Sequence, residues 1–322
     1  IRAVERSRGL GDVYKRQNEW DAPSYLAGMQ KWYGAEGLRK GQSCLSHAEK
    51  GSVISTRQPG FELVLEKALG VLTHTQFARD AVQKKLPHLP CQMLPLPFAI
   101  DAPPLQHRAS TGPLRLVQFG WIGPNRRLEQ TLDVLAQMPE DFYFRLDVMG
   151  KVWDPHLIYD KLSQLNLGDR VHLHGFVPEL ILDNTLRQAH LVLNLRHPSM
   201  GEASGSQLRI WNAGAPAAVT REGWYAELPE EVAYFIDLEN EAAQLHRLFS
   251  KLANDRDATR PVGVAGRAYF EAHHSPESYA QNVVALAKET ALQASRDLAL
   301  RLKFEEKAHA LHPSLQERLT GL

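Results

Sequence analysis

From position 114 onward, apolar residues occur in short continuous runs that alternate with segments of helical spacing. The runs predict buried strands, and the 3.6-residue spacing between them predicts helices. The predicted strands are 114–119, 144–149, 171–174, 190–195 and 217–220, and the predicted helices are 128–138, 157–165, 184–188 and 207–213. Strands that alternate with helices are typical of a doubly wound parallel sheet with right-handed crossovers. The predicted fold class is therefore α/β with a Rossmann-like sheet.

The pattern is less regular before position 114 and helical after position 240. Before 114 it predicts helices at 61–69 and 76–85 and short extended segments at 70–73 and 91–96, and it predicts no strand in 18–60. The proline-rich segment 94–112 is typical of an interdomain linker. After 240 it predicts helices at 241–252, 264–272 and 279–292. The charged tail from Ser295 predicts a solvated terminal helix, with a crossing helix or a stalk as alternatives.

The first 17 residues, IRAVERSRGLGDVYKRQ, show neither helical nor strand periodicity. Their last seven letters resemble translated adaptor sequence found in metagenomic fragments. We therefore treat residues 1–17 as a non-native leader and expect the native N-terminus to be missing.

Composition narrows the class of protein. A chain of 322 residues suggests two domains. The formal net charge of +0 provides no global field that would attract nucleic acid or an anionic membrane. Two cysteines, Cys44 and Cys91, cannot form a metal cluster alone and indicate a reducing compartment. No apolar run reaches the roughly 20 residues of a membrane span, and no secretory signal is visible.

Two loops follow predicted strands, at the edge of the sheet where such folds bind ligands. The second, within RHPSMGEASGSQLRIWNAGAPAAVT (196–220), contains the small residues Gly201, Ala203, Ser204, Gly205 and Ser206 ahead of a helix. Small residues let the backbone N–H groups of a helix N-terminus approach an anion closely, and the helix dipole favours negative charge there. The pattern indicates a phosphate site or, as an alternative, a tight turn whose small residues only permit helix packing.

The first loop, QFGWIGPNRRLEQ, places Gly120 and Gly123 in a turn and Arg126 and Arg127 at the start of a helix. Guanidinium groups bind phosphate bidentately, so the loop is a candidate diphosphate clamp. The alternative is a pair of surface arginines. The third glycine of a dinucleotide fingerprint is absent, which argues against a nicotinamide-dependent oxidoreductase.

Glu202 is the carboxylate inside the second loop. A carboxylate beside a phosphate is unfavourable unless it has another task, such as holding the hydroxyls of a sugar. The alternative is that it occupies the first turn of a helix, where the dipole favours acids.

The segment 114–286 resembles the donor-binding domain of GT-B glycosyltransferases of family 4, the large group 1 family of retaining enzymes. The matching motifs are FGWIGPNRR, LDVMG, RVHLHGFVPE, NLRHPSMGEASGSQLRIWNAGAPAAVT and REGWYAELPEE. Residues 61–96, with GVLTHTQFARDAV, are similar to the closing part of the family's acceptor domain. The organisation expected after the leader is a partial acceptor domain (18–100), a linker (101–113), a nucleotide-sugar donor-binding domain (114–286) and a C-terminal helical tail (287–322).

The resemblance implies a nucleotide-sugar donor whose diphosphate is neutralised by Arg126 or Arg127 and by backbone N–H groups around 204–208. It implies that Glu202 faces the donor sugar, that the loop 176–178 lies by the nucleobase, and that Glu227 lines the cleft floor. The candidate catalytic residues are Glu202, Arg126 and Arg127. The candidate substrate-binding residues are Gly120, Gly123, Arg196, Gly201, Ser204, Gly205, Ser206, Gln207, Leu208, Arg209, Phe176, Val177 and Glu227.

Two positions depart from the family pattern. The family often has a second glutamate, which binds ribose, eight residues after the first, where this chain has Ile210; aligning backward from Gly214 places Arg209 there instead. The usual basic residue after the first-strand glycine is Trp121, so Arg126, Arg127 or Arg196 must meet the diphosphate charge.

The reaction implied is front-face transfer of a sugar with retention, in which placed cations and backbone donors stabilise the leaving diphosphate. It requires neither cofactor nor metal, and we interpret the single D-x-D motif, at 255–257, as chance.

The expected partners are a nucleotide-sugar donor and a glycan or lipid-linked acceptor in polysaccharide or cell-surface glycan synthesis, with no nucleic acid. The expected location is cytoplasmic, or peripheral at the inner membrane through the missing N-terminal part. The alternative is a non-catalytic nucleotide-binding module of the same fold. The sugar-transfer interpretation requires the two loops to close on a single pyrophosphate.

Overall fold

The computed structural model describes residues 22–309 except 56, 101–110 and 200. The chain divides into two compact units, of which unit 1 comprises 1–72, 79–92 and 284–322 and unit 2 comprises 73–78 and 93–283. The predicted linker lies largely outside the described residues.

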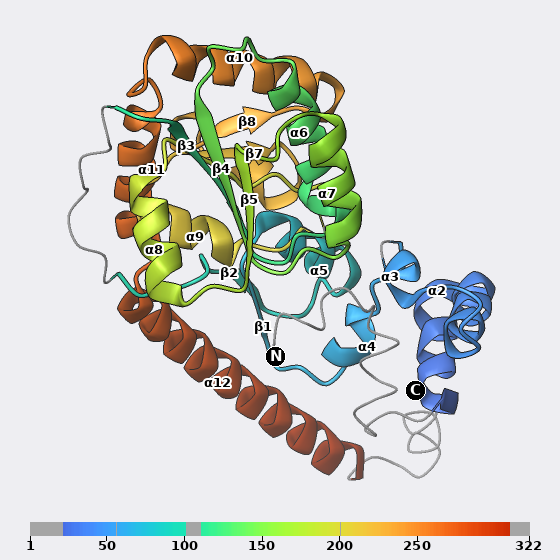
Figure 1. The fold of residues 1–322 in the computed structure, drawn as a ribbon. Helices are drawn as coiled ribbons and strands as arrows, with labels where there is room; N and C mark the ends of the chain where they lie inside the picture. The colour runs from blue at the N-terminus through green and yellow to red at the C-terminus, as the bar shows by residue number, and fades with distance from the viewer. Residues whose placement is uncertain (1–21, 56, 101–110, 200, 310–322) are drawn as a thin grey trace. The chain divides into compact units, whose positions relative to one another are not determined.

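Unit 2 is built on a six-stranded parallel sheet with the strand order β5-β4-β3-β6-β7-β8 (Figure 1). The strands are β3 (Leu114–Phe119), β4 (Phe144–Met149), β5 (Val171–Gly175), β6 (Leu191–Leu193), β7 (Ala217–Thr220) and β8 (Tyr234–Ile236). Because both faces of the central strands are covered, they read as continuous apolar runs. The predicted α/β class with a doubly wound parallel sheet is confirmed.

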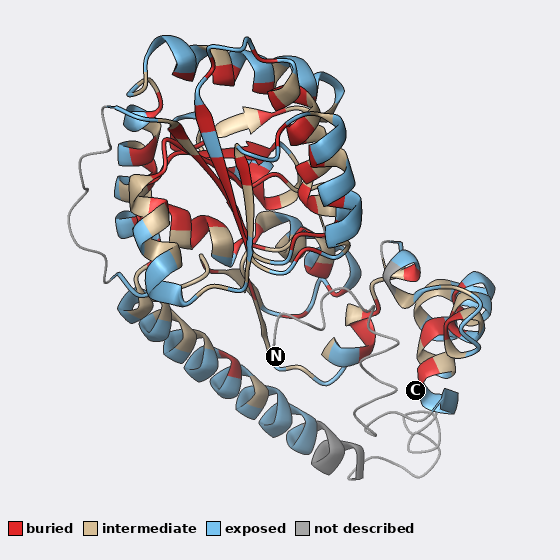
Figure 2. Ribbon diagram, viewed as in Figure 1, coloured by how far each residue is buried: buried red, intermediate tan, exposed pale blue. Residues whose placement is uncertain are grey.

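Two layers of helices cover the sheet. One hydrophobic core packs α6 (Leu128–Ala136), α7 (Pro155–Gln164) and α10 (Glu241–Asn254) on one face. The other packs α8 (Glu179–Gln188), α9 (Gly205–Asn212) and α11 (Arg260–His273) on the opposite face. Figure 2 shows buried strands between helices whose outer faces are exposed. The sheet edge at the carboxyl ends of the strands is where the candidate loops lie.

Unit 1 is helical, and two of its helices lie in the segment 18–60, for which no element was predicted. It contains α2 (Ala22–Leu45), which is broken at Gly34 (φ 67°), and the short α3 (Gly51–Ile54) and α4 (Phe61–Leu65). Helix α5 (Gln76–Lys85) and helix α12 (Pro276–His309) extend across the boundary with unit 2. Helix α12 joins the helix predicted at 279–292 and the terminal helix predicted for the charged tail from Ser295 in one element. A separate two-stranded sheet pairs β1 (Val71–Thr73) with β2 (Cys91–Met93).

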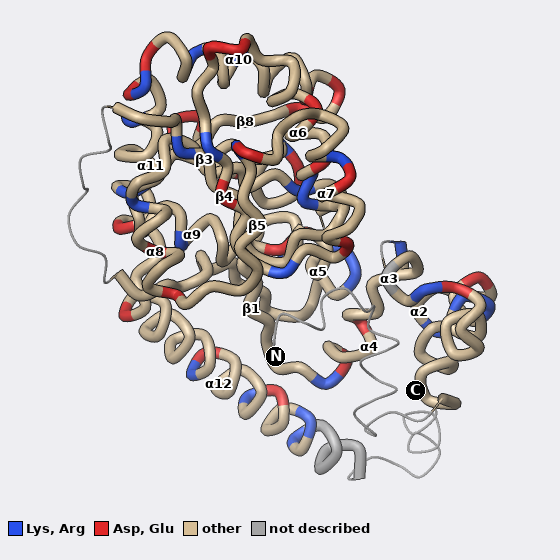
Figure 3. Tube along the Cα trace, in the orientation of Figure 1, with Lys and Arg blue, Asp and Glu red and all other residues tan. Residues whose placement is uncertain are grey.

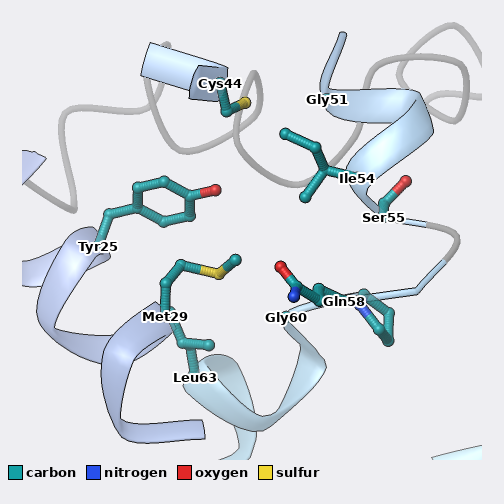
Figure 4. A pocket seen from close by; sticks show the side chains of 10 residues that line it. Tyr25, Met29, Cys44, Gly51, Ile54, Ser55, Gln58, Gly60 and Leu63 are labelled. Carbon is teal, nitrogen blue, oxygen red and sulfur yellow. The ribbon is translucent and has the colours of Figure 1, made fainter. Parts of the chain in front are cut away.

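A small cavity lies in unit 1 between α2, α3 and α4 (Figure 4). Its lining includes Tyr25, Met29, Cys44, Ile54 and Leu63. Its volume of about 10 Å³ has room for roughly one water molecule. The cavity is therefore too small for a sugar or a nucleotide.

Helices α8 and α11 of unit 2 begin earlier than predicted, at Glu179 and Arg260 instead of at 184 and 264. The pattern did not indicate the first turn of α8 because Leu180 and Ile181, which are 68% and 49% exposed, do not fit an amphipathic pattern. Strand β8 has only three residues and was not predicted. No helix in the described part of the chain combines the length and the hydropathy that crossing a membrane requires.

His274, at the C-terminal end of α11, makes the stability of unit 2 depend on pH. Its ring stacks on Phe270, and its Nδ1 lies 2.7 Å from the carbonyl oxygen of Leu96. Burial lowers the pKa of His274 below its ordinary value of 6.5, and outweighs the hydrogen bond to Leu96, which acts in the opposite direction. As the pH falls, His274 is protonated in the unfolded chain at a higher pH than in the native protein. The free energy of unfolding therefore falls as the pH drops below about 6.5.

We therefore expect His274→Phe to lose less stability in acid than the parent protein. Urea unfolding between about pH 5 and 8 measures this, and the difference in unfolding free energy between the two proteins should change by up to about 1.4 kcal/mol per pH unit. Parallel stability curves for the two proteins would contradict the assignment.

Candidate functional site

The two candidate loops lie side by side. Strands β3 and β6 are neighbours in the sheet and run parallel, so the turns that follow them emerge at the same edge. The backbone N–H of His197 in the second loop donates to the carbonyl oxygen of Asn125 in the first, at 2.8 Å. The strand order thus brings together the turns after β3 and β6, as the sugar-transfer interpretation requires.

Arg126 ends a 3₁₀ turn (Pro124–Arg126) and extends back under the end of β3, where it is 5% exposed. Its guanidinium donates to Asn194 Oδ1 at 2.9 Å and to the carbonyl oxygens of Phe119 and Trp121 at 3.3 and 3.4 Å. All three acceptors are neutral. Among the residues that the structure describes, no carboxylate forms an ion pair with Arg126.

Burial, with a smaller contribution from the nearby Arg196 guanidinium, lowers the pKa of Arg126 to about 10, although Tyr225 and Glu202 act in the opposite direction. Arg126 therefore still carries its positive charge at neutral pH. A buried cation without a carboxylate partner is unfavourable in a protein interior, because desolvation is not offset by an opposite charge.

Arg127 turns away from Arg126. Its backbone adopts the left-handed conformation (φ 59°), and its guanidinium makes a bidentate ion pair with Glu241 of α10, whose carboxyl is 7% exposed. The hydrogen bond from Arg127 to Glu241 raises the pKa of Arg127. The structure thus ties this predicted catalytic residue to α10 and does not bring its guanidinium to Asn194 and Arg126.

Glu202 and Arg196 form an ion pair in the second loop, between Glu202 Oε1 and Arg196 Nη1. Both side chains are partly exposed, at 25% and 15%. The backbone N–H of Arg196 donates to Thr220 Oγ1 at 2.9 Å, which ties the loop to the end of β7. Arg126, Arg196 and Glu202 together form a charged cluster with a net charge of +1, which is suited to an anion.

Helix α9 begins next to this cluster. The Ser204 side chain caps it by accepting the N–H of Gln207 at 3.2 Å. Gly205 is exposed and Ser206 half-buried, whereas Gln207 and Leu208 are fully buried. An N-terminus of this kind attracts anions through its dipole and its unpaired N–H groups.

Three glycines allow the turns to pack tightly. A Cβ on Gly120 (φ +103°) would lie 2.9 Å from Arg126 Nη2, and a Cβ on Gly201 (φ +78°) would lie 2.5 Å from the Phe77 ring. A Cβ on Gly123 would lie 3.1 Å from the Asn125 side chain. The absence of a side chain at these three glycines lets the neighbouring side chains lie close to the backbone.

Two other predicted residues, Glu227 and Arg209, have clear partners. The Glu227 carboxylate accepts the backbone N–H groups of Gln76 and Phe77 at 2.8 and 2.9 Å, and so caps the first turn of α5. Arg209 forms a bidentate ion pair with Asp183 of α8, with its Nε 2.7 Å from Oδ1. Phe176, by contrast, is 90% exposed in the loop after β5, with Val177 half-buried beside it.

The sequence analysis missed two polar residues at the centre of the site, Gln118 and Asn194. They are 1% and 2% exposed and lie where the apolar runs of β3 and β6 reach the sheet edge. Figure 3 shows that charged residues colour the helices and loops far more than the central strands. A lone amide inside an otherwise apolar strand was the signal that could have identified both.

Known structures share this fold. The model is similar to Anabaena HepE, solved in complex with UDP and glucose, with 15% identity over 74% of this chain and 67% of that chain and a TM-score of 0.60. It is similar to sucrose-phosphate synthase from Thermosynechococcus elongatus, with 20% identity over 80% of this chain and 66% of that chain and a TM-score of 0.59. For WaaG, a glycosyltransferase involved in lipopolysaccharide biosynthesis, the identity is 17% over 73% of this chain and 70% of that chain, with a TM-score of 0.54.

Neither a protein-family model nor a curated protein sequence matches the chain. At these identities the structural similarity establishes the fold, which is that of GT-B glycosyltransferases. The match spans about two thirds of the length of HepE and of sucrose-phosphate synthase.

Proposed function

We propose that this chain of GT-B fold binds a nucleotide-diphosphate sugar and transfers the sugar, with retention, to a glycan or lipid-linked acceptor. The observation that carries the proposal is the buried charge of Arg126, which has only neutral hydrogen-bond partners and lies beside the Arg196–Glu202 pair. A diphosphate would supply the negative charge that this cluster lacks. The first turn of α9 would add backbone N–H groups to the same anion.

The arrangement suits the departure of a nucleoside diphosphate. As the bond between the sugar's anomeric carbon and the phosphate oxygen breaks, charge builds on the diphosphate, and preorganised cations stabilise it. The acceptor oxygen forms its bond to the anomeric carbon on the same face, and the departing diphosphate can take the acceptor's proton. Arg126 and Arg196 are the residues that would hold this charge.

Glu202 has a separate role in the proposal. Its carboxylate would otherwise repel the diphosphate, but the ion pair with Arg196 offsets that charge. A carboxylate has about four lone-pair sites, so Glu202 can also accept hydrogen bonds from sugar hydroxyls. Its task would be to recognise the sugar and not the nucleotide.

Glu202→Gln therefore separates the two parts of the donor. We expect UDP affinity to stay the same or to increase, because a negative charge near the phosphate is removed. Affinity for the UDP-sugar and its rate of hydrolysis or transfer should fall by roughly 10-fold, which corresponds to the loss of about one charge-assisted hydrogen bond. Glu239→Gln, an exposed carboxylate-to-amide change in the turn before α10, is the matched control.

Calorimetry with UDP, GDP and dTDP, followed by the sugar conjugate of whichever nucleotide binds, tests the whole proposal. Binding together with transfer or donor hydrolysis supports it. Nucleotide binding with no turnover would instead support a non-catalytic nucleotide-binding module. If none of the three nucleotides binds, the proposal is wrong.

A further inference from the structure

Three buried amide side chains surround Arg126, and we call them the amide cluster: Gln118, Asn194 and Gln207. They are 1%, 2% and 0% exposed. Gln118 Nε2 donates to the backbone carbonyl of Arg126 at 2.7 Å, and Asn194 Oδ1 accepts from the Arg126 guanidinium at 2.9 Å. Asn194 Nδ2 donates to Gln207 Oε1 at 2.9 Å. The cluster joins the turn after β3, the end of β6 and the first turn of α9.

Asn194 occupies the position where a counter-ion for Arg126 would be expected. Buried cations are ordinarily paired with a carboxylate, and aspartate has nearly the shape of asparagine. Asn194 is therefore the residue that leaves the guanidinium without a compensating charge.

Hydrogen bonding does not require an asparagine at this position. The Tyr225 hydroxyl, which now accepts from Asn194 at 2.9 Å, could donate to a carboxylate instead. Gln207 Nε2 is buried without a partner, and a flip of that amide would turn it toward position 194 as a donor. Both neighbours could thus donate to an aspartate, and Arg126 would gain an ion pair.

We propose that the amide cluster, through Asn194, keeps the charge of Arg126 uncompensated so that the diphosphate of the donor completes it. Asn194 is in this view a positioning residue: it orients the guanidinium against the start of α9 and contributes no charge of its own. The inference rests on the proposed function for the identity of the anion. It predicts that the ligand-free protein gives up stability in order to bind the diphosphate.

Asn194→Asp tests the proposal because its two expected effects have opposite signs. The melting temperature without ligand should stay the same or rise, since Arg126 gains a counter-ion. Affinity for UDP and for inorganic pyrophosphate should fall by at least about 10-fold, which is 1.4 kcal/mol. A side chain with a merely structural role would lower both quantities together.

Two further variants complete the test. Asn194→Ala removes the contacts without adding charge, so it should lower the melting temperature and weaken UDP binding less than Asn194→Asp does. Gln188→Glu makes the same amide-to-carboxylate change beside Arg115, near the start of β3, and should leave UDP affinity unchanged.

Each outcome is decisive. If Asn194→Asp binds UDP within about threefold of the parent protein, or if it melts at a lower temperature, the role assigned to Asn194 is wrong. If the parent protein binds none of UDP, GDP, dTDP and pyrophosphate, the proposed function fails, and a higher melting temperature of Asn194→Asp would still support an uncompensated Arg126.

Discussion

Substituting Gly150 by alanine is expected to destabilise unit 2 by at least about 3 kcal/mol, within the range of severe single substitutions. Gly150 follows β4 with φ +134°, a conformation that residues with side chains rarely adopt. A Cβ there would lie 1.9 Å from the carbonyl oxygen of Gly120, and backbone cannot give way as a flexible side chain can. The Gly150 N–H also donates to the Gly175 carbonyl oxygen at 2.6 Å, so any movement disturbs the ends of three strands.

The same substitution should weaken nucleotide binding, because the Gly120 turn leads directly into the segment that carries Arg126. Urea unfolding and UDP calorimetry on the folded fraction measure the two effects. Gly168→Ala is the matched control, since a Cβ there would meet no atom within 4 Å. Equal unfolding free energies for Gly150→Ala and the parent protein would show that the three strand ends are not packed as described.

Replacing Arg126 with methionine should lower the rate of sugar transfer or donor hydrolysis by about 10²- to 10³-fold, the usual cost of losing one preorganised group that stabilises developing charge. UDP affinity should fall as well, since the buried cation beside the α9 N-terminus is lost. Methionine keeps much of the volume under Gly120 but removes a buried charge that has only neutral partners. We therefore expect little loss of thermal stability.

Arg127→Met is the informative neighbour for this experiment. In the parent protein the Arg127 guanidinium pairs with Glu241. The substitution leaves this nearly buried carboxylate without a cation and should lower the melting temperature. UDP affinity should change by no more than about threefold, or about 0.7 kcal/mol. If Arg127→Met abolishes nucleotide binding and Arg126→Met does not, the two arginines have been assigned the wrong way round.

Several features of the fold could be predicted because they depend on local pattern. The runs at 114–119, 144–149 and 217–220 coincide with β3, β4 and β7, since strands covered on both faces are predominantly apolar. Helix α2 was missed because its apolar residues are spaced irregularly around the break at Gly34. The start of α8 was missed because exposed leucine and isoleucine side chains disguise its amphipathic pattern.

The sequence by itself determined the α/β class, the positions of the central strands and the two loops that meet at the sheet edge. Only the tertiary structure decided what each charged side chain in those loops does. Arg126 and Arg127 are adjacent and alike in sequence, but one contacts Asn194, 68 positions away, and the other Glu241, 114 positions away. Periodicity is a property of neighbouring residues, whereas the partner of a buried charge depends on how distant segments pack. The pattern could therefore identify the two candidate loops but not distinguish the two arginines.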